Sequence, residues 1–242
     1  MTMILVTGAT DGLGLALARR LAAGGADVLV HGRDRDRVAA AAEAVGAAGS
    51  FIADFSRLAD VRALADELPP LHALVNNAGV IAPERVVTKD GNELTFQVNH
   101  LAHFLLTLRL MPPRVVHVAS GAQRVPDFGD LTLERGYEPW RAYGVSKLAQ
   151  IMFSNELAAR RPEVESVALH PATFMDTKMV RETIGTPHST VEEGVEATAR
   201  LVTAPGVSGQ YFNGLEESRA DAAAYDAEAR ERLWDVSEQL VA

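Results

Sequence analysis

The sequence predicts an α/β fold in which a parallel β-sheet is covered by helices on both faces. Short apolar runs alternate with longer amphipathic stretches along the chain, and a glycine-rich turn joins the first run to the first stretch. Apolar strands that alternate with amphipathic helices imply a parallel sheet with both faces covered. No linker, repeat or low-complexity segment divides the 242 residues. We therefore expect one domain spanning residues 1–242.

The elements of the N-terminal half follow this alternation. Residues 3–7 predict a buried strand, and Leu13, Leu17 and Leu21 then recur at helical spacing until Gly24 and Gly25 end the helix. The pattern continues with strand 27–31, helix 35–45, strand 50–53, helix 57–68 and strand 71–75.

The C-terminal half repeats the pattern with longer helices. We expect helix 92–111, strand 114–119, helix 143–160, strand 164–169, helix 191–203 and a short strand near residues 210–212. Two segments, 121–140 and 175–189, do not fit the alternation. Residues 124–140 are interpreted as an insertion bordering a substrate entrance, although a plain surface loop is equally consistent with them.

Composition excludes several classes of partner and chemistry. The net charge of −9 argues against non-specific binding to nucleic acid or to anionic membranes. The absence of cysteine excludes disulfides, thiolate metal sites and a cysteine nucleophile, and it suits a cytoplasmic protein. Residues 1–7 lead directly into a strand, so no signal peptide is expected. The most apolar helical stretch, 100–111, is too short to span a bilayer. We expect a small-molecule ligand and no metal.

A glycine-rich turn at residues 7–14 connects the first strand to the first helix. Small residues there let the backbone approach a pyrophosphate, and the helix N-terminus supplies amide donors. The spacing, Gly8-x-x-x-Gly12-x-Gly14, differs from the commonest dinucleotide fingerprint. Ordinary turn chemistry is the alternative interpretation.

Tyr143 and Lys147 stand four residues apart on one helix. They are neighbours on its surface, and a solvated face is the ordinary explanation. As a pair they also make chemical sense, because reduction of a ketone leaves an alkoxide that needs an acid. Tyrosine, with a pKa of about 10, is too weak an acid or base alone. A nearby ammonium is expected to stabilise the phenolate and lower that pKa.

Several motifs in this order resemble the short-chain dehydrogenases/reductases over essentially the whole chain. They are Thr7-Gly8-x-x-x-Gly12-x-Gly14, Asn76-Asn77-Ala78-Gly79, Asn99, Ser120, Tyr143-x-x-x-Lys147 and the turn at Pro171. Residues 98–107 and 142–149 are most similar to the retinol dehydrogenase and WW-domain oxidoreductase branch. The resemblance implies a doubly wound Rossmann fold with a seven-stranded parallel sheet. It also implies hydride exchange between a nicotinamide and a carbonyl/alcohol pair.

The resemblance assigns four catalytic residues. It makes Tyr143 the acid/base, Lys147 a partner that also holds the nicotinamide ribose, Ser120 a donor to the substrate oxygen, and Asn99 a link in a water-mediated proton relay. Viewed singly, Ser120 is better explained as a hydroxyl that satisfies local backbone, and Asn99 as a structural polar residue of its helix. A rival function, a dinucleotide-binding sensor or scaffold without turnover, would be favoured by loss of Tyr143 or Lys147, and neither is lost.

The end of the second strand bears on cofactor choice. Gly32 occupies the position where NAD-preferring relatives carry an acid. Arg33 follows it, with Arg37 as a second candidate, and a guanidinium suits a 2′-phosphate. NADP is therefore favoured and NAD is possible, since Asp11 stands where many NADP-preferring relatives carry a base. The remaining cofactor residues by resemblance are Gly8, Thr10, Asp11, Gly12, Leu13, Gly14, Asp54, Phe55, Asn77, Ala78, Gly79, Pro171 and Thr173.

Two further expectations come from the resemblance. Residues 178–189 would form a short substrate lid, after a turn in which Ala172 replaces the usual glycine. Helices 92–111 and 143–160 would form the surface of a homodimer or homotetramer. The side chains expected in that contact are Leu106, Leu110, Ile151 and Leu157.

Overall fold

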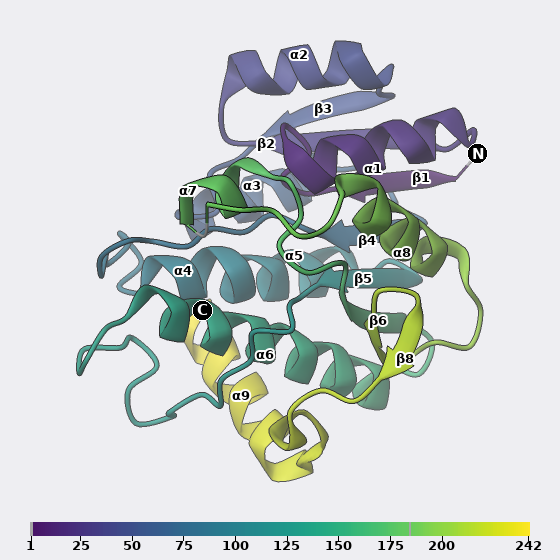
Figure 1. The fold of residues 1–242 in the computed structure, drawn as a ribbon. Coiled ribbons are helices and arrows are strands. Elements are labelled where there is room, and N and C mark those ends of the chain that lie inside the picture. The colour runs from purple at the N-terminus through teal and green to yellow at the C-terminus, as the bar shows by residue number, and fades with distance from the viewer. Residues whose placement is uncertain (1, 184) are drawn as a thin grey trace.

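The computed structural model describes residues 2–183 and 185–242, in which eight strands form one sheet in the order β3-β2-β1-β4-β5-β6-β7-β8 (Figure 1). All neighbouring pairs from β3 to β7 are parallel, and β8 pairs antiparallel with β7. The strands are β1 (Met3–Val6), β2 (Asp27–Gly32), β3 (Gly49–Ile52), β4 (Ala73–Asn76), β5 (Arg114–Val118), β6 (Glu165–His170), β7 (Tyr211–Asn213) and β8 (Glu216–Ser218).

Helices cover both faces of this sheet. One face carries α1 (Gly12–Ala23), α2 (Arg35–Val45) and α8 (Val191–Thr203), which pack side by side (Figure 1). The other face carries α3 (Leu58–Glu67), α5 (Ala102–Leu110), α6 (Pro139–Arg160) and α9 (Ala227–Leu240). Shorter elements complete the described residues: α4 (Leu94–Phe96), a π-helical turn (Gln97–Leu101), α7 (Lys178–Thr183) and a 3₁₀ turn (Ala222–Tyr225).

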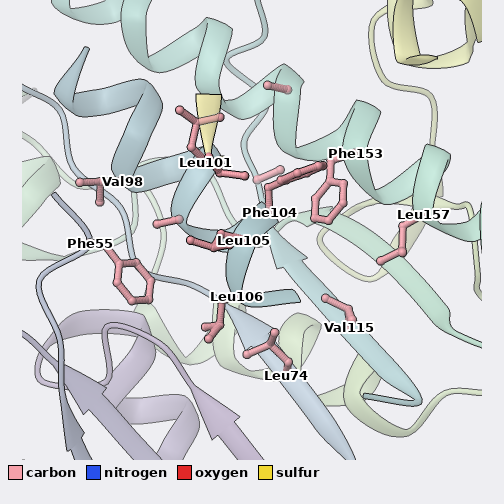
Figure 2. Close-up of a cluster of buried hydrophobic side chains, with 14 of the residues drawn as sticks. Phe55, Leu74, Val98, Leu101, Phe104, Leu105, Leu106, Val115, Phe153 and Leu157 are labelled. Carbon is pink, nitrogen blue, oxygen red and sulfur yellow. The ribbon is translucent and has the colours of Figure 1, made fainter. Parts of the chain in front are cut away.

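Each face of the sheet has its own hydrophobic core. Successive strand residues point to opposite faces, so Ile4 and Val6 join the core under α1 and α8, while Leu5 joins the other. Figure 2 shows the second core, where Phe104 of α5 lies against Phe153 of α6 with ring centroids 4.9 Å apart. This alternation explains why the strands are apolar at nearly every position.

The predicted α/β fold with seven parallel strands is confirmed, and the differences are local. Strand β8 was not predicted, because Glu216-Glu217-Ser218 has no apolar pattern and is half-exposed or exposed. Helix α6 begins at Pro139 rather than at residue 143, since Glu138 caps it by accepting from the Arg141 amide at 3.2 Å. Helices α7 and α9 were also not predicted.

Helix α9 corrects the expected dimer contacts. Leu106, Ile151 and Leu157 are completely buried within their own chain, so the prediction that they meet a partner is wrong. Trp234 of α9 packs on this side of the molecule, with its ring 5.2 Å from Phe104. Of the four expected residues only Leu110 is partly exposed.

The carboxyl ends of β1, β4, β5 and β6 lie in sheet order along one edge. The motif residues Thr7, Asn77, Ser120 and Pro171 each follow one of these ends. The fold therefore gathers motifs that are far apart in sequence, at the edge where ligands of doubly wound sheets bind. Within the described residues, no helix is long and apolar enough to cross a membrane.

Candidate active site

The glycine-rich turn after β1 lies directly on the turn after β4. Gly8 has a left-handed backbone (φ +65°), and a Cβ there would lie 2.8 Å from the Ala78 Cα. A Cβ on Gly14 would lie 2.3 Å from the Gly8 carbonyl oxygen. Glycine is needed at both positions because backbone occupies the space of a side chain.

Hydrogen bonds hold the two turns together. The Thr7 hydroxyl accepts from the backbone amides of Asn77 and Ala78 at 2.9 and 3.0 Å. The Asn77 side chain donates back to the Thr7 carbonyl at 2.8 Å. The structure thus brings the predicted cofactor residues of both turns, 8–14 and 77–79, into one surface.

This surface includes the N-terminus of α1. Asp11 caps the helix by accepting from the Gly12 amide at 2.7 Å. First-turn amides such as those of Leu13 and Gly14 have no acceptor within the helix, and the helix dipole adds partial positive charge. A glycine cradle at a helix N-terminus fits the pyrophosphate of a dinucleotide.

The end of β2 bears on the choice between NAD and NADP. A Cβ on Gly32 would lie 2.5 Å from the Thr10 Cγ2 and 2.9 Å from the Val38 Cγ2, so an acidic side chain has no room there. The exposed Arg33 guanidinium has no ion-pair or hydrogen-bond partner among the described residues. Arg37, by contrast, is paired with the Asp11 carboxylate at 3.0 Å. Arg33 is the cation available to an anion at this point.

Asp54 and Phe55, after β3, have mainly structural contacts. The Asp54 carboxylate accepts from the Ser56 amide at 2.9 Å, which forms a local turn. Phe55 is buried and stacks on the imidazole of His31, with ring centroids 4.4 Å apart. Any contact of Phe55 with a nucleotide therefore involves its backbone rather than its ring.

Tyr143 and Ser120 meet at the ends of α6 and β5. Burial raises the pKa of the Tyr143 phenol, and a hydrogen bond with the Ser120 side chain opposes that increase. The Ser120 hydroxyl also accepts from the Ala122 amide at 3.1 Å. The sequence-based alternative, in which the Ser120 hydroxyl satisfies a local backbone group, is thus confirmed. The same hydroxyl also lies beside the Tyr143 phenol.

Lys147 is buried and has no acidic partner among the described residues. Its Nζ donates to the Val118 carbonyl and to the Gln150 Oε1, both at 2.8 Å, and lies 5.5 Å from the centre of the Tyr143 ring. Burial lowers the pKa of Lys147 to about 7. The expected lowering of the Tyr143 pKa by this ammonium is not found in this arrangement, because desolvation of the phenol dominates.

Asn99 lies in the π-helical turn that precedes α5. Its side chain accepts from the Val80 amide at 2.8 Å and donates to the Val80 carbonyl and the Ser146 hydroxyl at 3.0 and 2.9 Å. Asn99 thereby ties the turn after β4 to α6. These bonds support the structural interpretation of Asn99, while its part in a proton relay stays a prediction.

Two buried neighbours of these residues were missed from sequence. Gln150 accepts from Lys147 and stands three residues after it on α6, a spacing that places both on one helix face. His103 stands four residues after Asn99, and its Nδ1 lies 2.9 Å from the Asn99 carbonyl oxygen. The same helical spacing that identified Tyr143 and Lys147 was available for both pairs.

The segment after β6 covers the glycine-rich turn. Thr173, two residues after the buried Pro171, contacts His170 through a 3.0 Å hydrogen bond. Further on, a Cβ on Gly12 would lie 3.2 Å from the Thr177 Cγ2. The expected lid, 178–189, begins with α7, and its residue 184 lies outside the described residues.

Beside Tyr143 is a cavity of ≈ 450 Å³. Its lining comes from residues 121–124 and from Glu138, Trp140, Arg141 and Gly144, so it is formed by the segment interpreted as an insertion and by the start of α6. Trp140, in this lining, has its ring centroid 5.7 Å from that of Tyr143. The cavity therefore adjoins Tyr143 through the Trp140 ring, and Tyr143 itself is not part of the lining.

Known proteins resemble the chain over most of its length. A family model for short chain dehydrogenases matches residues 2–187. Retinol dehydrogenase 14 of Homo sapiens is 35% identical, over 98% of this chain and 85% of that protein. The structure of an uncharacterized protein from Mycobacterium Paratuberculosis matches at 31% identity and a TM-score of 0.88, over 100% of this chain and 93% of that one. A short chain dehydrogenase from Burkholderia cenocepacia J2315 in complex with NADP matches at 26% identity and a TM-score of 0.71, over 88% and 95%.

Proposed function

Since the chain belongs to the short-chain dehydrogenase/reductase family, we propose that it transfers a hydride between NADP(H) and a carbonyl/alcohol pair. The observation that carries the proposal is the grouping of Tyr143, Ser120 and Lys147 at one edge of the sheet, beside a cavity of ≈ 450 Å³. In this proposal a substrate that enters from the cavity presents its oxygen to the hydrogen-bonded hydroxyls of Tyr143 and Ser120.

Each side chain has a role in this reaction. NADPH, when bound, supplies the hydride. Tyr143 donates a proton to the substrate oxygen on reduction and accepts it on oxidation, and Ser120 donates a hydrogen bond to the same oxygen. Lys147 can take up and release a proton near neutral pH, because burial lowers its pKa to about 7. Asn99 holds the turn at Val80 in position through its amide side chain.

The preference for NADP over NAD has support from two features. Gly32 leaves no room for the acid that would bind a ribose 2′-hydroxyl, and the neighbouring Arg33 is a cation with no ion pair among the described residues. A structural relative is described in complex with NADP. A 2′-phosphate would bind the Arg33 guanidinium through charge-assisted hydrogen bonds.

The activity is tested by following NADPH absorbance with a panel of aldehydes, ketones and alcohols. We expect turnover by the wild-type protein and a loss of at least about 10²-fold in Tyr143→Phe, the range of general acid–base catalysis. NADPH binding by Tyr143→Phe should be normal. Normal NADPH binding with no turnover of any substrate by the wild type would support the sensor or scaffold instead.

Cofactor choice is tested with Arg33→Ala. The variant should bind NADPH about tenfold or more weakly than the wild type, since a hydrogen bond to a charged group contributes about 1.5–3 kcal/mol. Its affinity for NADH should be nearly unchanged. Arg35→Ala, a neighbouring exposed arginine, is the matched control. Equal losses for NADPH and NADH would contradict the assignment.

Location and association stay predictions. A cytoplasmic location was expected from the composition, and fractionation of cells that make the protein tests it. A homodimer or homotetramer, if formed, must use a surface other than Leu106, Ile151 and Leu157, which are buried.

A further inference from the structure

The cavity beside Tyr143 is lined by charged groups as well as by an aromatic ring. Arg124, Arg141 and Glu138 are the charged residues of its lining, and Trp140 is the aromatic one. Two cations and one anion give this lining a local charge of +1, within a chain whose net charge is −9. The contrast in sign distinguishes the cavity from the protein as a whole.

Arg124 is held against α6 at Gly144, the residue after Tyr143. Its backbone amide donates to the Gly144 carbonyl at 3.1 Å, and its Cγ lies 2.8 Å from where a Cβ on Gly144 would stand. Any larger residue at position 144 would displace the arginine stem. Gly144 directly follows Tyr143 in the chain, so the absence of a side chain there lets Arg124 pack on the helical turn that carries the acid.

The Arg124 guanidinium has no ion pair or hydrogen bond within residues 2–183 and 185–242. Arg141 donates to the carbonyls of Arg135 and Gly136, both at 3.1 Å, and likewise has no carboxylate within 4.0 Å in the same ranges. The Glu138 carboxylate is engaged with the Arg141 backbone amide at the start of α6. Among the described residues, neither Glu138 nor any other carboxylate lies within 4.0 Å of the Arg124 guanidinium.

Trp140 supplies a flat apolar wall. Its ring meets the Tyr143 ring edge to face, at an interplanar angle of 85° and a centroid distance of 5.7 Å. A planar substrate group can lie on the indole face with its carbonyl directed at the phenol. Trp140 is only partly buried, so its ring remains accessible from the cavity.

We propose that this cavity selects aromatic carbonyl substrates that carry a carboxylate. The carboxylate binds the Arg124 guanidinium, the aromatic ring lies on Trp140, and the carbonyl oxygen accepts the Tyr143 proton. This inference rests on the proposed function, because it names the substrate class of the same site. A carboxylate pairs with a guanidinium through two parallel hydrogen bonds, which a neutral ester cannot reproduce.

The test compares 3- and 4-formylbenzoate with their methyl esters, using NADPH as hydride donor and kcat/KM as the measured quantity. The wild type should favour at least one acid over its ester by about tenfold, the low end of a hydrogen bond to a charged group, because Arg124 is exposed. Arg124→Gln should abolish this preference by lowering kcat/KM for the acid alone. Arg124→Glu should reverse it, favouring the ester.

Arg161→Ala is the matched control, because it removes an exposed arginine from the other end of α6. It should retain the preference of the wild type. Equal kcat/KM for acid and ester in the wild type would overturn the substrate class, while turnover of both would leave the proposed function intact.

A binding measurement separates the two proposals if no substrate is turned over. The chain has two tryptophans, and Trp140→Phe identifies the fluorescence that comes from the cavity. Quenching of Trp140 by formylbenzoate at lower concentration than by its ester, lost in Arg124→Gln, would support the anion-binding cavity even in an inactive protein. Equal quenching by both compounds would overturn it.

Discussion

Three buried histidines predict that the protein loses stability in mild acid, before its carboxylates titrate. Burial lowers the pKa of His31 to about 4 and the pKa values of His100 and His117 to about 3. All three lie in the interior of the fold. The folded chain therefore keeps them neutral at a pH where the unfolded chain would protonate them.

The sign and size of the effect follow from proton linkage. Below pH 6.5 the unfolded state binds more protons, so the free energy of unfolding falls as pH falls toward the folded pKa values. Between about pH 7.5 and pH 5.5 each histidine removes about 1.4 kcal/mol, or about 4 kcal/mol for the three. His103, whose pKa burial also lowers, adds to the loss in the same direction. Proteins have a total stability of about 5–15 kcal/mol, so the loss is large.

Urea unfolding followed by circular dichroism at the two pH values measures this loss. With a urea dependence of about 2–3 kcal/mol per molar, the midpoint should fall by about 1.5–2 M. His100→Leu removes one of the three groups, and it also removes a buried Nδ1 that has no hydrogen-bond partner within the described residues. It should reduce the pH dependence of the free energy of unfolding by about 1.4 kcal/mol.

His188→Leu is the control, since it removes an exposed histidine. If the two variants reduce the pH dependence equally, or if the wild-type midpoint is the same at both pH values, the linkage argument is refuted.

Three further predictions concern the site and its surroundings. Gly14→Ala should weaken NADPH binding and destabilise the fold by about 1–3 kcal/mol, because its Cβ would overlap the Gly8 carbonyl, and unchanged urea and NADPH titrations would contradict this. Asn99→Ala should destabilise the fold by about 1–3 kcal/mol and raise the KM for NADPH, since one buried and two partly buried hydrogen bonds are lost; wild-type values for both would refute the structural role. Sedimentation at micromolar concentration should show a dimer or tetramer, and Leu106→Ala should lower stability without changing the association state. A monomer at all concentrations would end the association prediction.

The sequence pattern predicted the layered core well because that pattern is local. Helix 35–45 and helix 191–203 coincide with α2 and α8, since each has an N-terminal capping residue and an apolar stripe. The missed elements lack such signals. Strand β8 exists because β7 offers it an edge and Gly214 adopts a left-handed turn (φ +59°), neither of which an apolar pattern encodes.

Helix α9 illustrates a different limit. The apolar residues of α9 are buried by packing on α5 and α6, where Trp234 contacts Phe104 and Phe153. The resemblance assigned that surface to a second copy of the chain. Three of the residues expected to meet a partner are instead buried within their own chain. Only the three-dimensional structure shows whether such an apolar surface is covered by a second copy or by another helix of the same chain.

In the candidate active site, too, the features set by local spacing could be predicted from the sequence, whereas those set by contacts between distant segments could not. Tyr143 and Lys147 are set by one helical turn, so their proximity could be predicted, but the electrostatics could not. Lys147 shares its ammonium between the Val118 carbonyl and Gln150, and the phenol responds mainly to its own burial. The position of Arg124 depends on Gly144, twenty residues later in the chain. The aliphatic part of the Arg124 side chain occupies the space that a Cβ on Gly144 would fill. Sequence spacing therefore predicts the proposed acid, whereas the group proposed to select its substrate is a consequence of packing between segments.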